Sequence, residues 1–327
     1  MIQFEPGFYL RRMALAASLV LAGCAAPVSS TGDAVERKLL SPWLTVTGSA
    51  PAMQPFGVRS VGGYIQLMRP TAVGAVHGDV YLLDAGLRRI FRYDRAQLSL
   101  TAFSDLPADD AMGLYAAPDM TVYVTDPNRR RVLQFTREGR LLRTFSDSLN
   151  LSRPVAVALD DKNGRVLVAD GLHDHIVAFD RLGQPLSVID SRGGEKPHLG
   201  IAGMATGPDG LYLVDRLTRQ VVVLDANGAY RHAFGKGTLA EPGAIAVDRA
   251  NRVFVSDNFD NTIKVYAEGG LVGTFGGSGG GPGQFNHIAG LAESQGLLYV
   301  ADSLNARIQI MLVAPAPKPK PAEKIQQ

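Results

Sequence analysis

The stretch that decides the fold is LYVADSLNARIQI, residues 298–310. An alternating apolar run ends at Asp302, a short polar interval contains Asn305 and Arg307, and a second alternating run follows. Alternation with a period of two predicts two strands joined by a short loop. The three polar residues are therefore either a site between two strands or part of the structure of the loop.

Five earlier segments repeat this pattern. The strand-like runs are VYLLD (80–84), VYVTD (122–126), VLVAD (166–170), LYLVD (211–215) and VFVSD (253–257), and each ends in aspartate. With Asp302 included, the intervals between the aspartates are 42, 44, 45, 42 and 45 residues. Six positions after each aspartate, a β-branched residue opens a second run, as in IVAFD (176–180). Shorter apolar segments precede and follow each pair of runs, so every unit contains four predicted strands.

This period predicts an all-β protein, a six-bladed β-propeller with one four-stranded antiparallel sheet per blade. Such sheets cannot cover both of their faces alone, so they stack around a central channel. The last unit stops after three strands near Val313, and an N-terminal strand must complete it and close the ring. This strand should come from the part between Trp43 and Leu67, where FGVRSV (56–61) or YIQL (64–67) would serve. We therefore expect the propeller to span residues 43–313.

The repeat closely resembles that of the NHL family. Each aspartate is followed by four variable residues, a polar position and Ile or Val, and later by a glycine turn; GGSGGGPGQFNHIAGLAES (276–294) is similar to the linker of that family. The resemblance covers most of the chain and implies a six-bladed propeller. It implies little about function, because the family includes binding scaffolds, sensor domains and lyases.

The repeated aspartates are expected to be structural. A residue type that recurs in every blade serves a need of every blade, and a carboxylate at the end of a strand can accept N–H groups of the turn. This applies to Asp84, Asp126, Asp170, Asp215, Asp257 and Asp302. We expect no catalytic residue among them, and function should lie where one blade departs from the others.

One face of the propeller is expected to be basic. If the strands are named a to d from the axis outward, the b–c loops and the d–a connections share one face, which we call the b–c face. The b–c loops carry the arginines Arg88, Arg89, Arg129, Arg130, Arg131, Arg216 and Arg219. Guanidinium groups bind carboxylates and phosphates, so these arginines are the candidate binding residues. The alternative is that they belong to ordinary solvated loops.

No metal or cofactor is expected. Resemblance to the amidoglycolate-lyase branch of NHL-like propellers would make histidines at the channel mouth zinc ligands, and the weak candidates are His198, Glu241, Asn286 and His287. A catalytic zinc usually needs three protein ligands, and only two histidines stand at comparable positions. His173 and His175 are interpreted as loop histidines.

The N-terminus predicts lipid anchoring. Arg11 and Arg12 precede an apolar run, and the segment LAGC ending at Cys24 closely resembles a bacterial lipobox. This resemblance implies a signal peptide over 1–23, acylation of Cys24, and a tether over 24–42. Ala25 stands where an aspartate would mark inner-membrane retention, which favours the outer membrane, facing the periplasm. Because Cys24 is the only cysteine, an intramolecular disulfide is excluded.

Charge and composition limit the classes of partner that we expect this chain to bind. The formal net charge of +2 is too small to favour a nucleic-acid partner. The tail over 314–327 is rich in proline and lysine and is expected to be disordered. We therefore expect a monomeric, lipid-anchored envelope propeller that binds or scaffolds a protein or an anionic envelope polymer without catalysis. The alternative is a metal-dependent lyase or lactonase-like enzyme with its site at the channel mouth.

Overall fold

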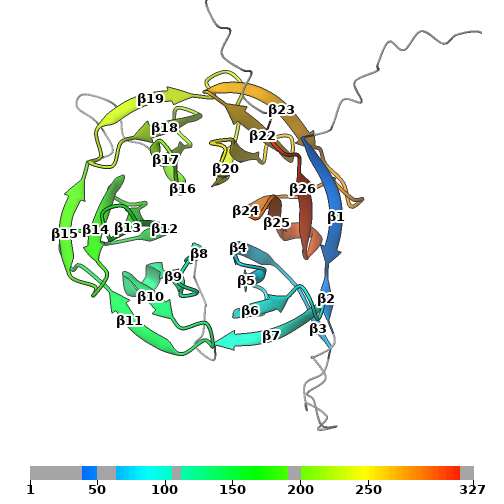
Figure 1. The fold of residues 1–327 in the computed structure, drawn as a ribbon, viewed down its shortest axis with the longest axis horizontal. Coiled ribbons are helices and arrows are strands. Elements are labelled where there is room, and N and C mark those ends of the chain that lie inside the picture. Colours follow the sequence, from blue (N-terminus) through cyan, green and yellow to red (C-terminus); the bar gives the residue numbers. More distant parts are fainter. Residues whose placement is uncertain (1–38, 50–63, 105–111, 191–199, 317–327) are drawn as a thin grey trace, which may run out of the picture. The chain divides into compact units, whose positions relative to one another are not determined.

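The computed structural model describes residues 39–49, 64–104, 112–190 and 200–316. These residues belong to one compact unit, in which six four-stranded antiparallel sheets surround a common axis (Figure 1). The predicted six-bladed propeller is confirmed. The predicted signal peptide, Cys24 and all but the first three residues of the predicted tail lie outside the described residues.

The blades follow one another along the chain. Blade 1 contains β4 (Pro70–Val76), β5 (Asp79–Asp84), β6 (Arg89–Asp94) and β7 (Ser99–Ser104). Blade 2 contains β8 (Leu114–Ala116), β9 (Val122–Asp126), β10 (Arg131–Phe135) and β11 (Leu141–Phe145). Blade 3 contains β12 (Pro154–Asp160), β13 (Arg165–Asp170), β14 (His175–Asp180) and β15 (Pro185–Ile189). Blade 4 contains β16 (Ile201–Gly207), β17 (Gly210–Asp215), β18 (Gln220–Leu224) and β19 (Tyr230–Phe234).

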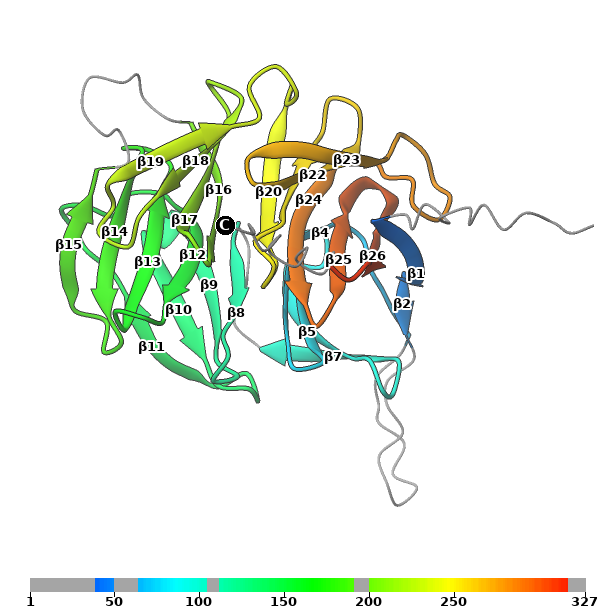
Figure 2. The ribbon, with the colours of Figure 1, turned by 45° about the horizontal axis from the view of Figure 1, so that its top comes forward.

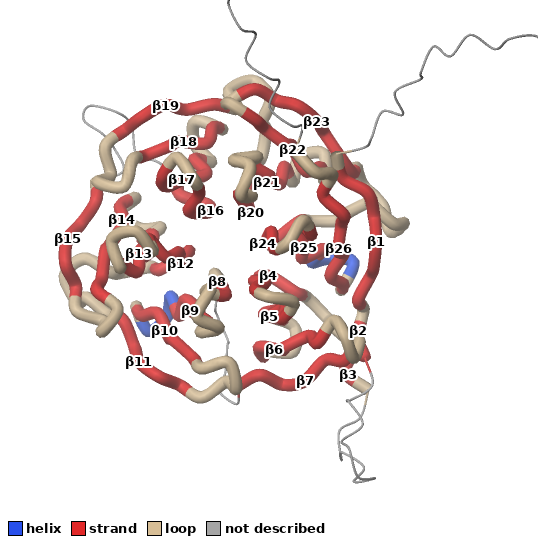
Figure 3. The backbone as a smooth tube through the Cα atoms, viewed as in Figure 1, coloured by secondary structure: helices blue, strands red, loops and turns tan. Residues whose placement is uncertain are grey.

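The last two blades complete the ring. Blade 5 contains β20 (Pro242–Val247), β21 (Val253–Asp257), β22 (Thr262–Ala267) and β23 (Gly270–Gly276). Blade 6 contains β24 (Ile288–Ser294), β25 (Leu297–Asp302) and β26 (Arg307–Val313), with β1 (Leu40–Val46) as its outer strand. One-turn 3₁₀-helices, η1 (Pro127–Arg129) and η2 (Ser303–Asn305), occupy the b–c loops of blades 2 and 6 (Figure 3).

An N-terminal strand closes the ring, as expected, but it begins before Trp43 and neither of the two named segments supplies it. β1 pairs antiparallel with β26, from Leu40 opposite Val313 to Val46 opposite Ile308. FGVRSV lies outside the described residues, and Ile65–Gln66 of YIQL forms β3, which pairs with β2 (Gly48–Ser49) in a separate small sheet. The propeller therefore begins at Leu40, within the expected tether. The strand could not be predicted from its sequence pattern, because the register shifts between Pro42 and Leu44 and the alternation of side chains is interrupted there.

The core consists of six apolar clusters, and each cluster joins two neighbouring blades. In blade 3, Val166 and Val168 pack against blade 2, whereas Leu167 and Ala169 pack against blade 4. The b and c strands are thus largely buried on both faces and mainly apolar, as expected for stacked sheets, although single polar residues such as Gln134 and Lys264 interrupt the c strands. Among the described residues, no helix has the length and apolar character needed to cross a membrane.

The path of the chain defines the two faces of the disc. The a strands surround the axis and the d strands form the rim, so the b–c loops and d–a connections share the b–c face (Figures 1 and 2). The a–b and c–d turns form the opposite face, which we call the a–b face. Because Leu40 pairs with Val313 at the end of β26, the described chain enters and leaves the disc on the a–b face.

Candidate functional site

The b–c loops share one backbone design in all six blades. The residue four positions after each repeat aspartate has a left-handed backbone, with φ between 51° and 58°, and the next residue begins strand c. The left-handed residues are Arg88, Arg130, Asp174, Arg219, Asn261 and Ala306. Only asparagine and aspartate among these residue types favour this conformation, so the fold imposes it on the others. The shared design fixes where each loop displays its side chains.

The repeat aspartates hold these loops in place, as expected. Asp170 is completely buried and accepts the backbone N–H groups of Arg153 at 2.7 Å and Leu172 at 2.8 Å. It therefore links the d–a connection to the b–c loop. Burial raises the pKa of Asp170, but these and further backbone N–H groups outweigh burial and hold the pKa below its usual value. Asp84 and Asp257 bind the corresponding backbone groups of blades 1 and 5.

The polar residues of the opening stretch form a structural network in blade 6. The carboxylate of Asp302 accepts hydrogen bonds from Arg307 Nε at 2.6 Å and from Asn305 Nδ2 at 3.0 Å. The other guanidinium N–H groups of Arg307 donate to the backbone oxygens of Gly280, Gly281 and Gln284. This network fastens the glycine-rich connection to the sheet through Asp302, Asn305 and Arg307.

The seven predicted arginines all lie in or directly beside the b–c loops of blades 1, 2 and 4. The side chain of Arg129 is 51% exposed and that of Arg131 is 33% exposed, and both contact Asp126. Arg88, Arg89, Arg130, Arg216 and Arg219 are exposed. Arg69 and Arg153, on the d–a connections, are exposed on the same face. These side chains place exposed cations on the b–c face at blades 1, 2 and 4 and on two d–a connections.

The same face also carries a set of exposed apolar side chains that were not predicted from the sequence. They stand two positions after the repeat aspartate in four successive blades. They are Leu172, Leu217, Phe259 and Leu304, which are 63%, 65%, 76% and 61% exposed. Leu149 and Met68, on d–a connections, are also exposed. The sequence does contain a signal for these residues, which is their shared position in the repeat: large apolar residues recur at one loop position where polar residues are usual.

The weak metal candidates are not assembled into a site within the described chain. The side chains of Glu241, Asn286 and His287 are exposed. Their backbone N–H groups are held by Asp257, Asp302 and Asn261, respectively. Neither Glu241 nor His287 belongs to a group of three described His, Cys, Asp or Glu side chains close enough to share an ion. His198 lies outside the described residues.

A cavity of about 260 Å³ opens in the central channel on the a–b face, and all six a strands line it. Its wall is mainly apolar, but Glu293 and Tyr115 contribute polar groups. Glu293 accepts the backbone N–H of Gly296 at 2.8 Å, and burial raises the pKa of its carboxyl. Sequence analysis did not single out Glu293, although it interrupts an otherwise apolar inner strand.

Comparisons with known proteins support the fold alone. The sequence matches no family model and no curated protein. The structure is similar to a catalytically inactive virginiamycin B lyase from Staphylococcus aureus with quinupristin (TM-score 0.55, 16% identity, covering 79% of this chain and 83% of that one). It is similar to a streptogramin B lyase (TM-score 0.58, 13% identity, 76% and 95% covered). A structural genomics protein of unknown function from Bacteroides thetaiotaomicron VPI-5482 is also similar (TM-score 0.61, 15% identity, 75% and 70% covered). At these identities the likeness shows a shared propeller architecture.

Proposed function

We propose that this chain is a lipid-anchored envelope protein of NHL type whose propeller is a non-catalytic binding module, with the b–c face as its contact surface. One observation carries the proposal. The b–c face combines exposed arginines in blades 1, 2 and 4 with exposed apolar side chains at equivalent positions of blades 3 to 6.

The chemistry of this face favours a protein partner with an acidic surface. Groups of exposed large apolar side chains mark interaction sites, and arginine is enriched in protein interfaces. Burial of the Leu217 and Phe259 side chains stabilises a complex only when the partner covers them with apolar surface. A carbohydrate polymer could neutralise the arginines but would leave these apolar side chains uncovered.

Anchoring through Cys24 fits the same arrangement. The described chain enters the disc on the a–b face, where Leu40 pairs with Val313. A tether reaching the disc there leaves the b–c face free to bind. Two or three acyl chains on the N-terminal cysteine would hold the protein at the membrane stably, whereas a single chain gives marginal binding.

The lyase or lactonase alternative gains no support from the described channel mouth. The exposed side chains of Glu241 and His287 belong to no three-ligand group there. The binding function is therefore the better supported of the two.

Site-specific photo-crosslinking in the native host tests the proposal. A photoreactive amino acid replaces Leu217 or Phe259 on the b–c face, and Leu98 or Leu182, which are similarly exposed on c–d turns, serves as the matched control. We expect discrete protein adducts from the b–c positions and none from the control positions. Adducts to phospholipid or polysaccharide alone, or equal adducts from both faces, would refute the proposed contact surface.

The same cells test the arginines and the anchor. Replacing Arg129, Arg130 and Arg131 together by alanine should lower the adduct yield several-fold and flatten its dependence on salt, because exposed charges act through screened attraction. An unchanged yield would remove these arginines from the contact surface.

Cys24→Ala should move the protein from the membrane fraction to the soluble fraction, and continued membrane association would contradict lipid anchoring.

A further inference from the structure

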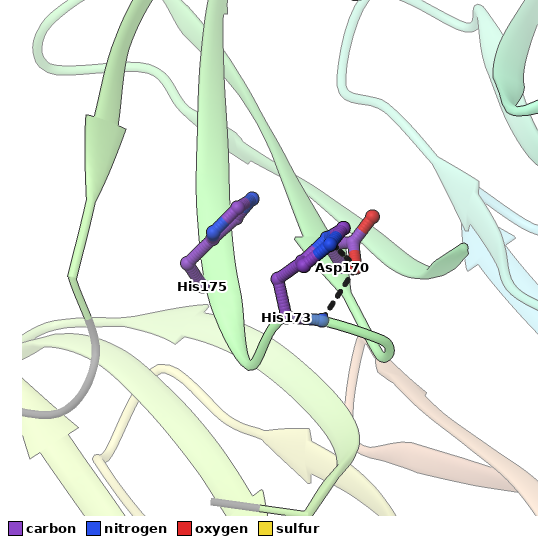
Figure 4. Close-up of side chains that lie close together, drawn as sticks. All are labelled: Asp170, His173 and His175. Carbon is purple, nitrogen blue, oxygen red and sulfur yellow. Dashed lines mark hydrogen bonds and ion pairs between the residues drawn. The ribbon is translucent and has the colours of Figure 1, made fainter. Parts of the chain in front are cut away.

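Blade 3 brings three metal-ligating side chains together on the b–c face. Asp170, His173 and His175 each offer one ligand atom, and these atoms all lie within 4.8 Å of one another (Figure 4). Among the described residues, this is the one such group of three His, Cys, Asp or Glu side chains. It lies in the b–c loop of a single blade, away from the candidates at the channel mouth.

The shared loop design produces this arrangement. Asp170 ends β13, His175 begins β14, and the left-handed Asp174 between the two histidines has φ 53°. The rings of His173 and His175 stack with centroids 5.4 Å apart and 14° between their planes. His173 Nδ1 lies 3.3 Å from the carboxylate of Asp170. Both imidazoles therefore lie on the same side of the loop.

No other blade places two imidazoles at these positions. The residues three and five positions after the repeat aspartate are Leu87 and Arg89, Arg129 and Arg131, Thr218 and Gln220, Asp260 and Thr262, and Asn305 and Arg307. Arginine has no lone pair to offer, and three of the five other blades carry it at the second of these positions. Blade 3 thus departs from the other blades by carrying an imidazole at both positions.

A hydrogen bond prepares His175 for coordination. Its Nε2 lies 2.6 Å from the backbone oxygen of Asn150. A carbonyl oxygen can only accept, so Nε2 carries the hydrogen, which leaves the lone pair of Nδ1 free. Ligating histidines are commonly oriented by such a bond from the second ring nitrogen. The carboxylate of Asp147 also interacts electrostatically with His175 and adds negative charge beside the cluster.

We propose that Asp170, His173 and His175 form a binding site for a divalent transition-metal ion of the zinc class, with the two imidazoles as its principal ligands. Imidazole and carboxylate ligands suit zinc, and bond lengths of about 2.0–2.2 Å require the ligand atoms to move closer together. His173 can make this movement, because its side chain is 45% exposed. Asp170 already accepts several backbone N–H groups, so it contributes the weaker bond.

Zinc titration of the purified protein, measured by competition with a fluorescent chelator, tests the site. We expect one zinc ion per chain. His173→Ala and His175→Gln should each weaken binding by about tenfold or more, and the double variant should abolish it. His232→Ala is the matched control, because His232 is an exposed histidine on β19 beside Phe234. His173→Ala removes an exposed side chain, and an unchanged circular dichroism spectrum shows that the fold is kept.

Cobalt(II) substitution supplies a readout of ligation itself. Binding to the two imidazoles should give visible absorption bands that His173→Ala removes and His232→Ala leaves unchanged. Zinc binding that persists unchanged in the double variant would overturn the proposal. Failure of the unsubstituted protein to bind more zinc than the double variant would overturn it equally.

Discussion

Arg307 and Arg131 occupy the same position of the repeat and have different surroundings. Each begins strand c, five residues after its repeat aspartate, and each follows a 3₁₀-helix. Arg307 is 9% exposed and donates to Asp302 and to three backbone oxygens of the preceding connection. Arg131 contacts Asp126 at 3.0 Å and keeps a third of its side chain in solvent. The neighbouring d–a connection therefore decides whether an arginine on this face supports the fold or is free to contact a partner.

Removing each arginine should separate the two roles and give the largest effect on stability. We expect Arg307→Ala to lower the free energy of unfolding by about 3–5 kcal/mol, because it leaves the buried carboxylate of Asp302 without its cation. Arg131→Ala should cost less, about 1 kcal/mol, because this ion pair is partly open to solvent. Urea unfolding at neutral pH measures both values. Equal losses would show that the two pairs are energetically alike.

The repeat itself could be predicted because every unit obeys the same alternation. Six aspartates at near-constant spacing define the b strands, and the apolar b and c strands reflect burial on both faces. The closing strand β1 could not be predicted, because Pro42 breaks its alternation and its pairing with β26 is a long-range contact. Local pattern contains no information about which distant segment fills an open edge.

The candidate site was predictable only in part. Charge and position placed the arginines in the b–c loops, but nothing local distinguishes Arg131 from Arg307. The meeting of His173, His175 and Asp170 depends on the left-handed backbone at Asp174. The exposure of Phe259 depends on the same tertiary framework. The sequence shows which residues are present, but the fold determines which of their side chains lie close together.

In blade 5 the buried repeat aspartate pairs with a lysine at a different position of strand c, and this pair should make the stability of the protein sensitive to pH. Asp257 is completely buried and pairs with Lys264. Burial raises the pKa of Asp257, but the hydrogen bond from Lys264 and those from nearby backbone N–H groups outweigh it and lower the pKa below 3.8. Burial lowers the pKa of Lys264, but the ion pair with Asp257 outweighs it and raises the pKa above 10.5.

The two shifts act at opposite ends of the pH range. The contribution of Asp257 is present above its unfolded pKa of about 3.9 and is lost as the pH falls through the lower folded value. The contribution of Lys264 is complete below its unfolded pKa and is lost as the pH rises through the higher folded value. Each group can change the free energy of unfolding by at most about 1.4 kcal/mol per pH unit.

Urea unfolding as a function of pH, compared with Asp257→Asn, tests this assignment. The unsubstituted protein should exceed the variant in stability near neutral pH. The difference should shrink in acid as Asp257 becomes protonated, and in alkali as Lys264 loses its proton. A difference that stays constant across the whole range would show that the ion pair does not control the stability of this loop.

The smallest expected effect concerns the left-handed position of the b–c loops, compared between blades 2 and 6. Arg130 has φ 51° and ψ 47°, and Ala306 has φ 52° and ψ 44°. A side chain in this conformation costs roughly 1–2 kcal/mol, whereas glycine adopts it freely but loses more chain entropy on folding. We therefore expect Ala306→Gly and Arg130→Gly each to stabilise the protein by up to about 1 kcal/mol in thermal or urea unfolding.

These two glycine variants match in backbone effect and differ in charge. Arg130→Gly removes an exposed cation from the proposed contact surface, so it should reduce crosslinking to the partner while stabilising the fold. Ala306→Gly should stabilise the fold and leave crosslinking unchanged. Asn261→Gly should give no gain in stability. Asparagine already tolerates a left-handed backbone, observed here at φ 55°, and the substitution removes the hydrogen bonds of the Asn261 side chain with His287 N–H and Ser278. Loss of stability in both Arg130→Gly and Ala306→Gly would mean that the side chains at this position support the loop, so that Arg130 resembles Arg307 more closely than its exposure indicates.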